Sequence, residues 1–137
     1  MAKLKHPERT LSEVKLVSSH FGPVDFDDTT VVVHKFDLPH TFNRASSKLL
    51  IILPSDYPEM PPTDLYVEKR LKRNGQIPGH YFENQYGDRK IRKAGFAWYS
   101  IHFNAWNANA RSIIRGDNLL TAIDALHDSL KRDDERG

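Results

Sequence analysis

The residue types best suited to chemistry lie close together between positions 98 and 106. Ser100 carries a hydroxyl, and His102 carries an imidazole two positions later. If residues 97–103 form a strand, alternate side chains share a face, and Trp98, Ser100 and His102 lie on the same side. A serine hydroxyl is a poor nucleophile unless a base within hydrogen-bond reach takes its proton. The spacing is therefore compatible with two interpretations. The first is a serine activated by His102, and the second, simpler one is an exposed Ser and His without a catalytic role.

Asn104 is the candidate for stabilising the negative charge that a serine attack would develop. It is one of three asparagines around Trp106, and all three are turn-forming residues first. If Asn104 lies near Ser100, its amide can donate a hydrogen bond to an oxyanion. The histidines form no short metal-spacing motif such as H-x-x-x-H, so neither a metal nor a cofactor is predicted.

Capping patterns and hydrophobic periodicity predict the elements that position these residues. Thr10-Leu11-Ser12-Glu13 has the form of a capping box, which predicts a helix that ends at Gly22. Asp117 is predicted to cap a second helix, whose apolar residues recur from position 119 to 130. Strands are predicted at 29–36, 48–53, 65–67 and 96–103, the second apolar enough to be covered on both faces. This order predicts an α+β fold, with both helices packed on one face of an antiparallel meander.

Length and composition restrict the possible classes of protein. The chain has 137 residues, of which 39% are hydrophobic and 28% charged, as expected for one globular domain over 1–137. The absence of cysteine excludes disulfides, thiolate metal sites and a cysteine nucleophile. No apolar run approaches the ~20 residues of a membrane span, and the N-terminus lacks a signal peptide's apolar stretch. We therefore expect a cytoplasmic protein without a membrane partner, with a charged, frayed tail at 132–137.

Residues 68–93 carry most of the positive charge. They contain eight Lys or Arg residues and three acids, a local net charge of +5, whereas the whole chain carries +2. Because the segment is rich in Gly, Asn and Gln, it is predicted to be an exposed basic loop over about 68–95. It is either a solvated loop or a docking surface for an acidic partner. The small total charge, without a basic helix or an aromatic repeat, argues against nucleic acid. The residues expected to meet an acidic partner are Lys69, Arg70, Lys72 and Arg73.

The stretch from Pro54 to Pro62 contains four prolines in nine residues and cannot form a regular element. It resembles the proline-rich turn of the ubiquitin-conjugating (UBC) fold, in which a strand runs into Pro-x-x-Tyr-Pro-x-x-Pro-Pro. Such a turn is rigid because prolines fix φ, and a buried tyrosine anchors it. We expect the Tyr57 side chain to be buried and its hydroxyl to be hydrogen-bonded. The matching fixed residues are Pro54, Tyr57, Pro58, Pro61 and Pro62.

More narrowly, residues 11–131 resemble a bacterial family of UBC-like proteins, often called family E. The resemblance rests on the proline turn, on Ser-x-His ahead of Trp106, and on the helix start Gly116-Asp117-Asn118-Leu119-Leu120. It implies a UBC-like fold and an operon with three partners. These are a ubiquitin-like protein, a ThiF-type activating enzyme and a metallopeptidase that removes the modifier.

The chain departs from the UBC pattern at the reactive centre. Classical members carry a cysteine several residues before the tryptophan, preceded by a His-Pro-Asn turn, and here Ser100 lies in that neighbourhood. The nearest counterpart of the turn is His80-Tyr81-Phe82-Glu83-Asn84, with stretched spacing. The proline turn lies 38 residues before Ser100, counting from 62 to 100, a length that an insertion explains.

The resemblance and the missing cysteine leave two functions open. In the first, Ser100 accepts the ubiquitin-like protein as an oxyester and passes it to a target amine. His102 assists, and Asn84 or Asn104 stabilises the oxyanion. In the second, the protein is a catalytically inactive UBC-fold module that binds the modifier or its activating enzyme. The absence of cysteine favours the second, and the Ser-x-His pair favours the first.

Overall fold

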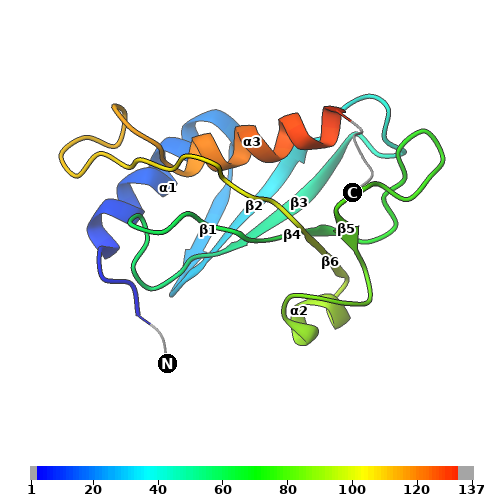
Figure 1. Ribbon diagram of the computed structural model, residues 1–137, viewed down its shortest axis with the longest axis horizontal. Coiled ribbons are helices and arrows are strands. Elements are labelled where there is room, and N and C mark those ends of the chain that lie inside the picture. Colours follow the sequence, from blue (N-terminus) through cyan, green and yellow to red (C-terminus); the bar gives the residue numbers. More distant parts are fainter. Residues whose placement is uncertain (1–2, 133–137) are drawn as a thin grey trace.

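The computed structural model describes residues 3–132, in which helices enclose one side of an antiparallel sheet. The elements of this part of the chain are α1 (Pro7–Phe21), β1 (Val24–Asp27), β2 (Thr30–Asp37), β3 (Ser46–Ile52), β4 (Asp64–Glu68), β5 (Tyr81–Phe82), α2 (Arg89–Lys93), β6 (Phe96–Tyr99) and α3 (Leu119–Arg132). The strand order is β1-β2-β3-β4-β6-β5. Helices α1 and α3 lie over the same face of the sheet (Figure 1). This is the predicted α+β, UBC-like arrangement.

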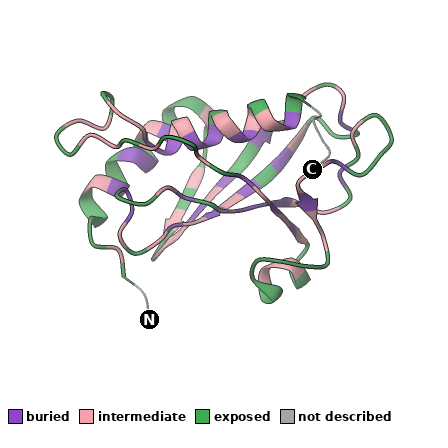
Figure 2. Cartoon of the chain, in the orientation of Figure 1, coloured by how far each residue is buried: buried purple, intermediate pink, exposed green. Residues whose placement is uncertain are grey.

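The core lies between these two helices and the sheet. Alternate positions of β3 and of the first half of β2 are buried, as the period of two along a strand requires, whereas the three central residues of β4 are all buried. Their buried side chains include Val33, Leu49 and Val67, which lie side by side in the register. Helix α3 buries one stripe, from Leu119 to Leu130, against them. Figure 2 shows these buried positions on the central strands and on α3.

The other face of the sheet is only partly covered. The prediction that both faces of residues 48–53 are covered is wrong: Leu50 and Ile52 remain half-buried, because α1 and α3 both lie on the opposite face. Leu50 belongs to a row of paired residues that crosses the sheet on this face. That row consists of Val32, Leu50, Tyr66, Trp98 and Phe82.

Both long helices begin at residues other than those predicted. Helix α1 begins at Pro7, whose fixed φ suits the first turn, so Thr10 is an interior residue and its hydroxyl donates to the carbonyl of His6. Helix α3 is capped by Asn118, whose Oδ1 accepts from the Thr121 N–H at 3.2 Å. Asp117 instead accepts from the Asn107 N–H at 2.6 Å and so closes the loop that precedes α3.

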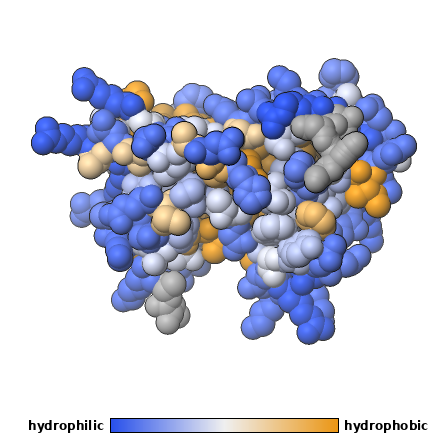
Figure 3. All heavy atoms as spheres, viewed as in Figure 1, coloured by the Kyte–Doolittle hydropathy of each residue, from blue (hydrophilic) through white to orange (hydrophobic). Residues whose placement is uncertain are grey.

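The predicted basic loop contains two short elements. Strand β5 pairs with β6 at the edge of the sheet. Helix α2 forms because the Asp88 carboxylate accepts from the N–H groups of Lys90 and Ile91. The prediction that the chain has no basic helix is therefore wrong. Hydrophilic side chains gather over the region below β6, where α2 lies (Figures 1 and 3).

Two further predictions concern the C-terminal tail and the membrane. Beyond Arg132, the predicted frayed tail lies outside the described residues. Within residues 3–132, no helix combines the length and the apolar character that crossing a membrane requires.

Candidate functional site

The proline turn is anchored by one buried carboxylate. As predicted, Tyr57 is fully buried, and its hydroxyl donates to Oε1 of Glu13, which is also fully buried. The same oxygen accepts from the Leu119 N–H at 2.8 Å, and Arg9 Nε donates to Oε2 at 2.7 Å. Glu13 therefore joins α1, the proline turn and the start of α3. Burial, reinforced by the Glu13 charge, raises the pKa of the Tyr57 phenol far above its ordinary range.

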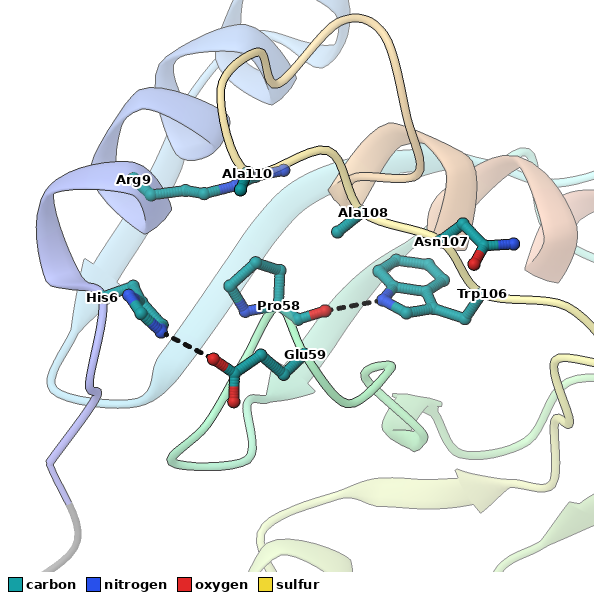
Figure 4. A pocket seen from close by; sticks show the side chains of 8 residues that line it. All are labelled: His6, Arg9, Pro58, Glu59, Trp106, Asn107, Ala108 and Ala110. Atoms are coloured by element: carbon teal, nitrogen blue, oxygen red, sulfur yellow. Dashed lines mark hydrogen bonds and ion pairs between the residues drawn. The ribbon is translucent and has the colours of Figure 1, made fainter.

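Trp106 attaches the next loop to the proline turn. Its indole N–H donates to the Pro58 carbonyl at 2.8 Å (Figure 4). Its ring lies 6.2 Å from that of Tyr57. Beside this contact lies a pocket of about 400 Å³, across which His6 reaches Glu59 at 3.3 Å. The pocket is lined by His6, Arg9, Pro58, Glu59, Trp106, Asn107, Ala108 and Ala110. Pro58 and Pro62 are buried and Pro61 is half-buried, whereas Glu59 and Met60 between them are exposed.

Ser100 is the first residue after β6. The predicted strand to residue 103 is wrong in its length, because β6 ends at Tyr99, although the Ser100 N–H still donates to the His80 carbonyl at 2.8 Å. The Ser100 side chain is half-buried and His102 is exposed. Among the hydrogen bonds of residues 3–132, none joins the Ser100 hydroxyl to His102.

The two candidate oxyanion donors lie in different segments of the chain, after β5 and after β6. Strand β5 runs antiparallel to β6, with Phe82 opposite Trp98. After Phe82, the chain therefore runs toward Phe96, the first residue of β6, and away from Ser100. Asn84 follows on that course and is exposed. Asn104 is exposed in the segment after β6, and no side-chain hydrogen bond of Asn104 is found in the described part of the chain.

The comparison with known protein families decides the class of this protein. The model of one family, described as Prokaryotic E2 family E, matches residues 8–133. The chain belongs to prokaryotic E2 family E. Membership identifies it as a UBC-like protein of bacterial ubiquitin-like conjugation, consistent with its fold. The comparisons with curated proteins and with solved structures gave no match.

In this family E protein, Ser100 has one neighbour that was not predicted from the sequence. His80 accepts the Ser100 N–H through its carbonyl, and its ring lies 6.1 Å from the Tyr99 ring. The sequence offered His80 only as the first residue of a stretched counterpart to His-Pro-Asn. No periodicity marks a two-residue strand, so the pairing of β5 with β6 could not be found from the pattern.

The basic residues of the family E protein form two segments that meet at the end of the sheet. The Lys69 N–H donates to the Gly95 carbonyl at 3.0 Å, which brings residues 69–73 beside the end of α2. Arg70 and Lys72 are exposed, whereas Arg73 is half-buried and donates to the Lys131 carbonyl at 2.9 Å. The Tyr81 hydroxyl, together with Lys69 and Lys72, lowers the pKa of the nearby Glu83 carboxyl.

Proposed function

We propose that the protein accepts a ubiquitin-like protein from a ThiF-type activating enzyme as an oxyester of Ser100, and passes it to a target amine. Membership of prokaryotic E2 family E supports the conjugation chemistry. The observation that carries the serine assignment is the place of Ser100. It is half-exposed at the end of β6, ahead of the Trp106 that attaches the proline turn. Because the chain has no cysteine, a covalently held modifier must be bonded through oxygen or nitrogen.

The reaction consists of two acyl transfers. In the first, the Ser100 hydroxyl attacks the carbonyl carbon of the thioester that links the modifier to the activating enzyme, and the thiolate leaves. In the second, a target amine attacks the oxyester carbonyl, and the serine oxygen recovers its proton. The residues proposed from the sequence to assist are His102, as the base, and Asn104 or Asn84, as oxyanion donors. A metallopeptidase that removes the modifier would complete the set of partners.

The Ser100→Ala variant tests this function. The parent protein, incubated with the modifier, the activating enzyme and ATP, should form an adduct that resists thiol reductants and is cleaved by hydroxylamine or alkali. Ser100→Ala should form none, because no oxygen remains to bond the acyl group at this position. Gel shift and peptide mass spectrometry measure the adduct. Ser19→Ala, an exposed serine of α1, is the matched control.

The second candidate function is an inactive module that binds the modifier or its activating enzyme. It is favoured by the exposure of His102 and by the lack of a hydrogen bond to Ser100 within the described residues. A complex that forms without any adduct, equally in the parent and in Ser100→Ala, would establish this function and exclude the oxyester.

We also propose that the basic segment attracts an acidic patch of the activating enzyme or of the modifier. Replacing Lys69, Arg70 and Lys72 together by Glu should slow association about tenfold or more at low salt, because exposed charges govern encounter. Arg73 is left unchanged because its guanidinium holds the Lys131 carbonyl.

Stopped-flow measurements over a series of salt concentrations test this electrostatic attraction. Lys15→Glu on α1 is the control, and we expect it to change the rate much less. An unchanged rate in the triple variant at ~50 mM salt, where the Debye length exceeds ~10 Å, would exclude this docking surface.

A further inference from the structure

The register of the sheet places a carboxylate opposite Ser100. The last pair of β4 and β6 is Leu65 with Tyr99, and the next residues outward are Asp64 and Ser100. Asp64 is held in place on its other side, where it pairs with Ile52 of β3. The Ser100 N–H points away from β4, toward the His80 carbonyl. Asp64 and Ser100 therefore occupy a non-hydrogen-bonded position of the β4–β6 ladder. In an antiparallel sheet, such a position brings the two Cα atoms to about 4.5 Å and the side chains close together.

Both side chains belong to the face that the long helices leave open. Tyr66 and Trp98 form a pair on this face, and Asp64 and Ser100 each lie two residues further along the same strands. The side chains of Tyr66 and Trp98 both act on the Asp64 carboxyl, and each favours its ionised form. Trp98 is its diagonal neighbour, at about 7–8 Å between backbones, whereas Ser100 is directly opposite at about 4.5–5.5 Å. Alternation along the two strands therefore places Asp64 and Ser100 on the same face, as the next position beyond the Tyr66–Trp98 pair.

The surroundings of Asp64 suit a proton acceptor. Burial raises the pKa of this carboxyl above its ordinary value, although the neighbouring Tyr66 and Trp98 side chains oppose the shift. A carboxylate with a raised pKa is a stronger base near neutral pH. The other acidic group that acts on it is Asp88, the cap of α2, whose charge raises the pKa further.

An open hollow gives access to Asp64. It measures about 570 Å³ and lies between the end of β3, the proline turn and the start of β4. Asp64 and Asp56 are its two carboxylates, and the rest of its wall is largely apolar. The hollow therefore leaves the Asp64 side open to an approaching acyl donor.

We propose that Asp64, rather than His102, is the general base that takes the proton of the Ser100 hydroxyl when Ser100 is acylated. This inference rests on the function proposed above. The Ser100 oxygen bonds to the thioester carbonyl carbon while its proton passes to Asp64. The C–S bond then breaks, and the leaving thiolate takes that proton back from Asp64.

The test uses p-nitrophenyl acetate as the acyl donor, so that it does not depend on the natural partners. Acetylation of Ser100 is followed by peptide mass spectrometry in the parent, Asp64→Asn and Asp64→Glu. We expect Asp64→Asn to acetylate Ser100 about 100-fold more slowly, as loss of a general base does, and Asp64→Glu to recover part of the rate. Asp56→Asn, in the same hollow, is the matched control, and circular dichroism checks that each variant is folded.

A pH profile adds a readout that a merely structural role would not change. Because the ionised carboxylate is the active form, the parent rate should rise as pH increases through the raised pKa of Asp64. This rise should be absent from Asp64→Asn.

The outcomes separate this inference from the proposed function. Equal acetylation of Ser100 in the parent and in Asp64→Asn would overturn the role of Asp64 and leave the Ser100 oxyester standing. A loss of rate in His102→Ala, with none in Asp64→Asn, would return the base role to His102. No acetylation of Ser100 in the parent would also overturn the role of Asp64. The adduct experiment with the activating enzyme then decides the proposed function separately.

Discussion

Replacing Glu13 by Ala should lower the free energy of unfolding by about 3–5 kcal/mol, the range found when one partner of a buried ion pair is removed. The side chain is fully buried, and Arg9, its partner, is 13% exposed. The substitution would leave the Arg9 charge, the Tyr57 hydroxyl and the Leu119 N–H without their acceptor. Each buried polar group left unpaired adds to the loss.

Urea unfolding, followed by tryptophan fluorescence, measures this effect. Glu8→Ala, an exposed acid in the first turn of α1, is the matched control and should change stability by less than about 0.5 kcal/mol. Glu13→Gln should fall between the two, because its amide keeps one acceptor oxygen and loses the charge. If Glu13→Ala cost less than ~1 kcal/mol, the carboxylate would not be the link among α1, the proline turn and α3.

Tyr57→Ala should destabilise the protein by a similar amount, roughly 3–5 kcal/mol, as truncation of a buried aromatic side chain does. The ring is fully buried and lies 6.2 Å from that of Trp106, so its removal leaves a cavity beneath the proline turn. Tyr57→Phe keeps the ring and removes only the hydroxyl, which donates a hydrogen bond to Glu13. It should lower the free energy of unfolding by about 1–3 kcal/mol.

The same unfolding measurements apply to Tyr57. Tyr86→Ala removes a tyrosine that is 55% exposed, and should cost much less than Tyr57→Ala. A loss below ~1 kcal/mol in Tyr57→Ala would mean that the turn lies loosely on the sheet. The double variant with Glu13→Ala should lose less than the sum of the two single losses, because the two residues share one hydrogen bond.

The elements that could be predicted from the sequence are those with a strong pattern of their own. The β-branched run of β2 and the apolar stripe of α3 each identify an element without help from the rest of the chain. The elements that were missed, β1, β5 and α2, have four, two and five residues. Strand β5 exists because β6 lies beside it, and it carries no pattern of its own. Helix α2 has a local signal in its Asp88 cap, but its five residues are too few to show a helical period.

The capping box at Thr10 shows how a correct local motif can serve a different purpose. The S/T-x-x-E spacing is present, but the helix starts one turn earlier at Pro7. Glu13 is bonded to residues 57 and 119, which are distant in the chain. A pattern of four neighbouring residues contains no information about such partners.

The candidate site was predictable only in part, for a related reason. Ser100 and its approximate place follow from the sequence, as do the burial of Tyr57 and its hydrogen bond. The neighbours of Ser100 depend on strand register: Asp64 lies 36 positions before it and His80 lies 20 positions before it, counting from 64 and 80 to 100. Spacing along one strand favoured His102, because neighbours on other strands cannot be read from such spacing.

The two edges of the sheet bear on how the protein behaves at high concentration. An exposed edge strand is a template on which a second chain can add, and long, flat, uncharged edges are the ones that aggregate. At one edge, β1 is four residues long and carries Asp25 and Asp27. At the other, β5 is two residues long, and His80 just before it has a φ of +62°, which turns the backbone away from an extended course. We therefore expect concentrated solutions of the folded protein to resist association through the sheet edges.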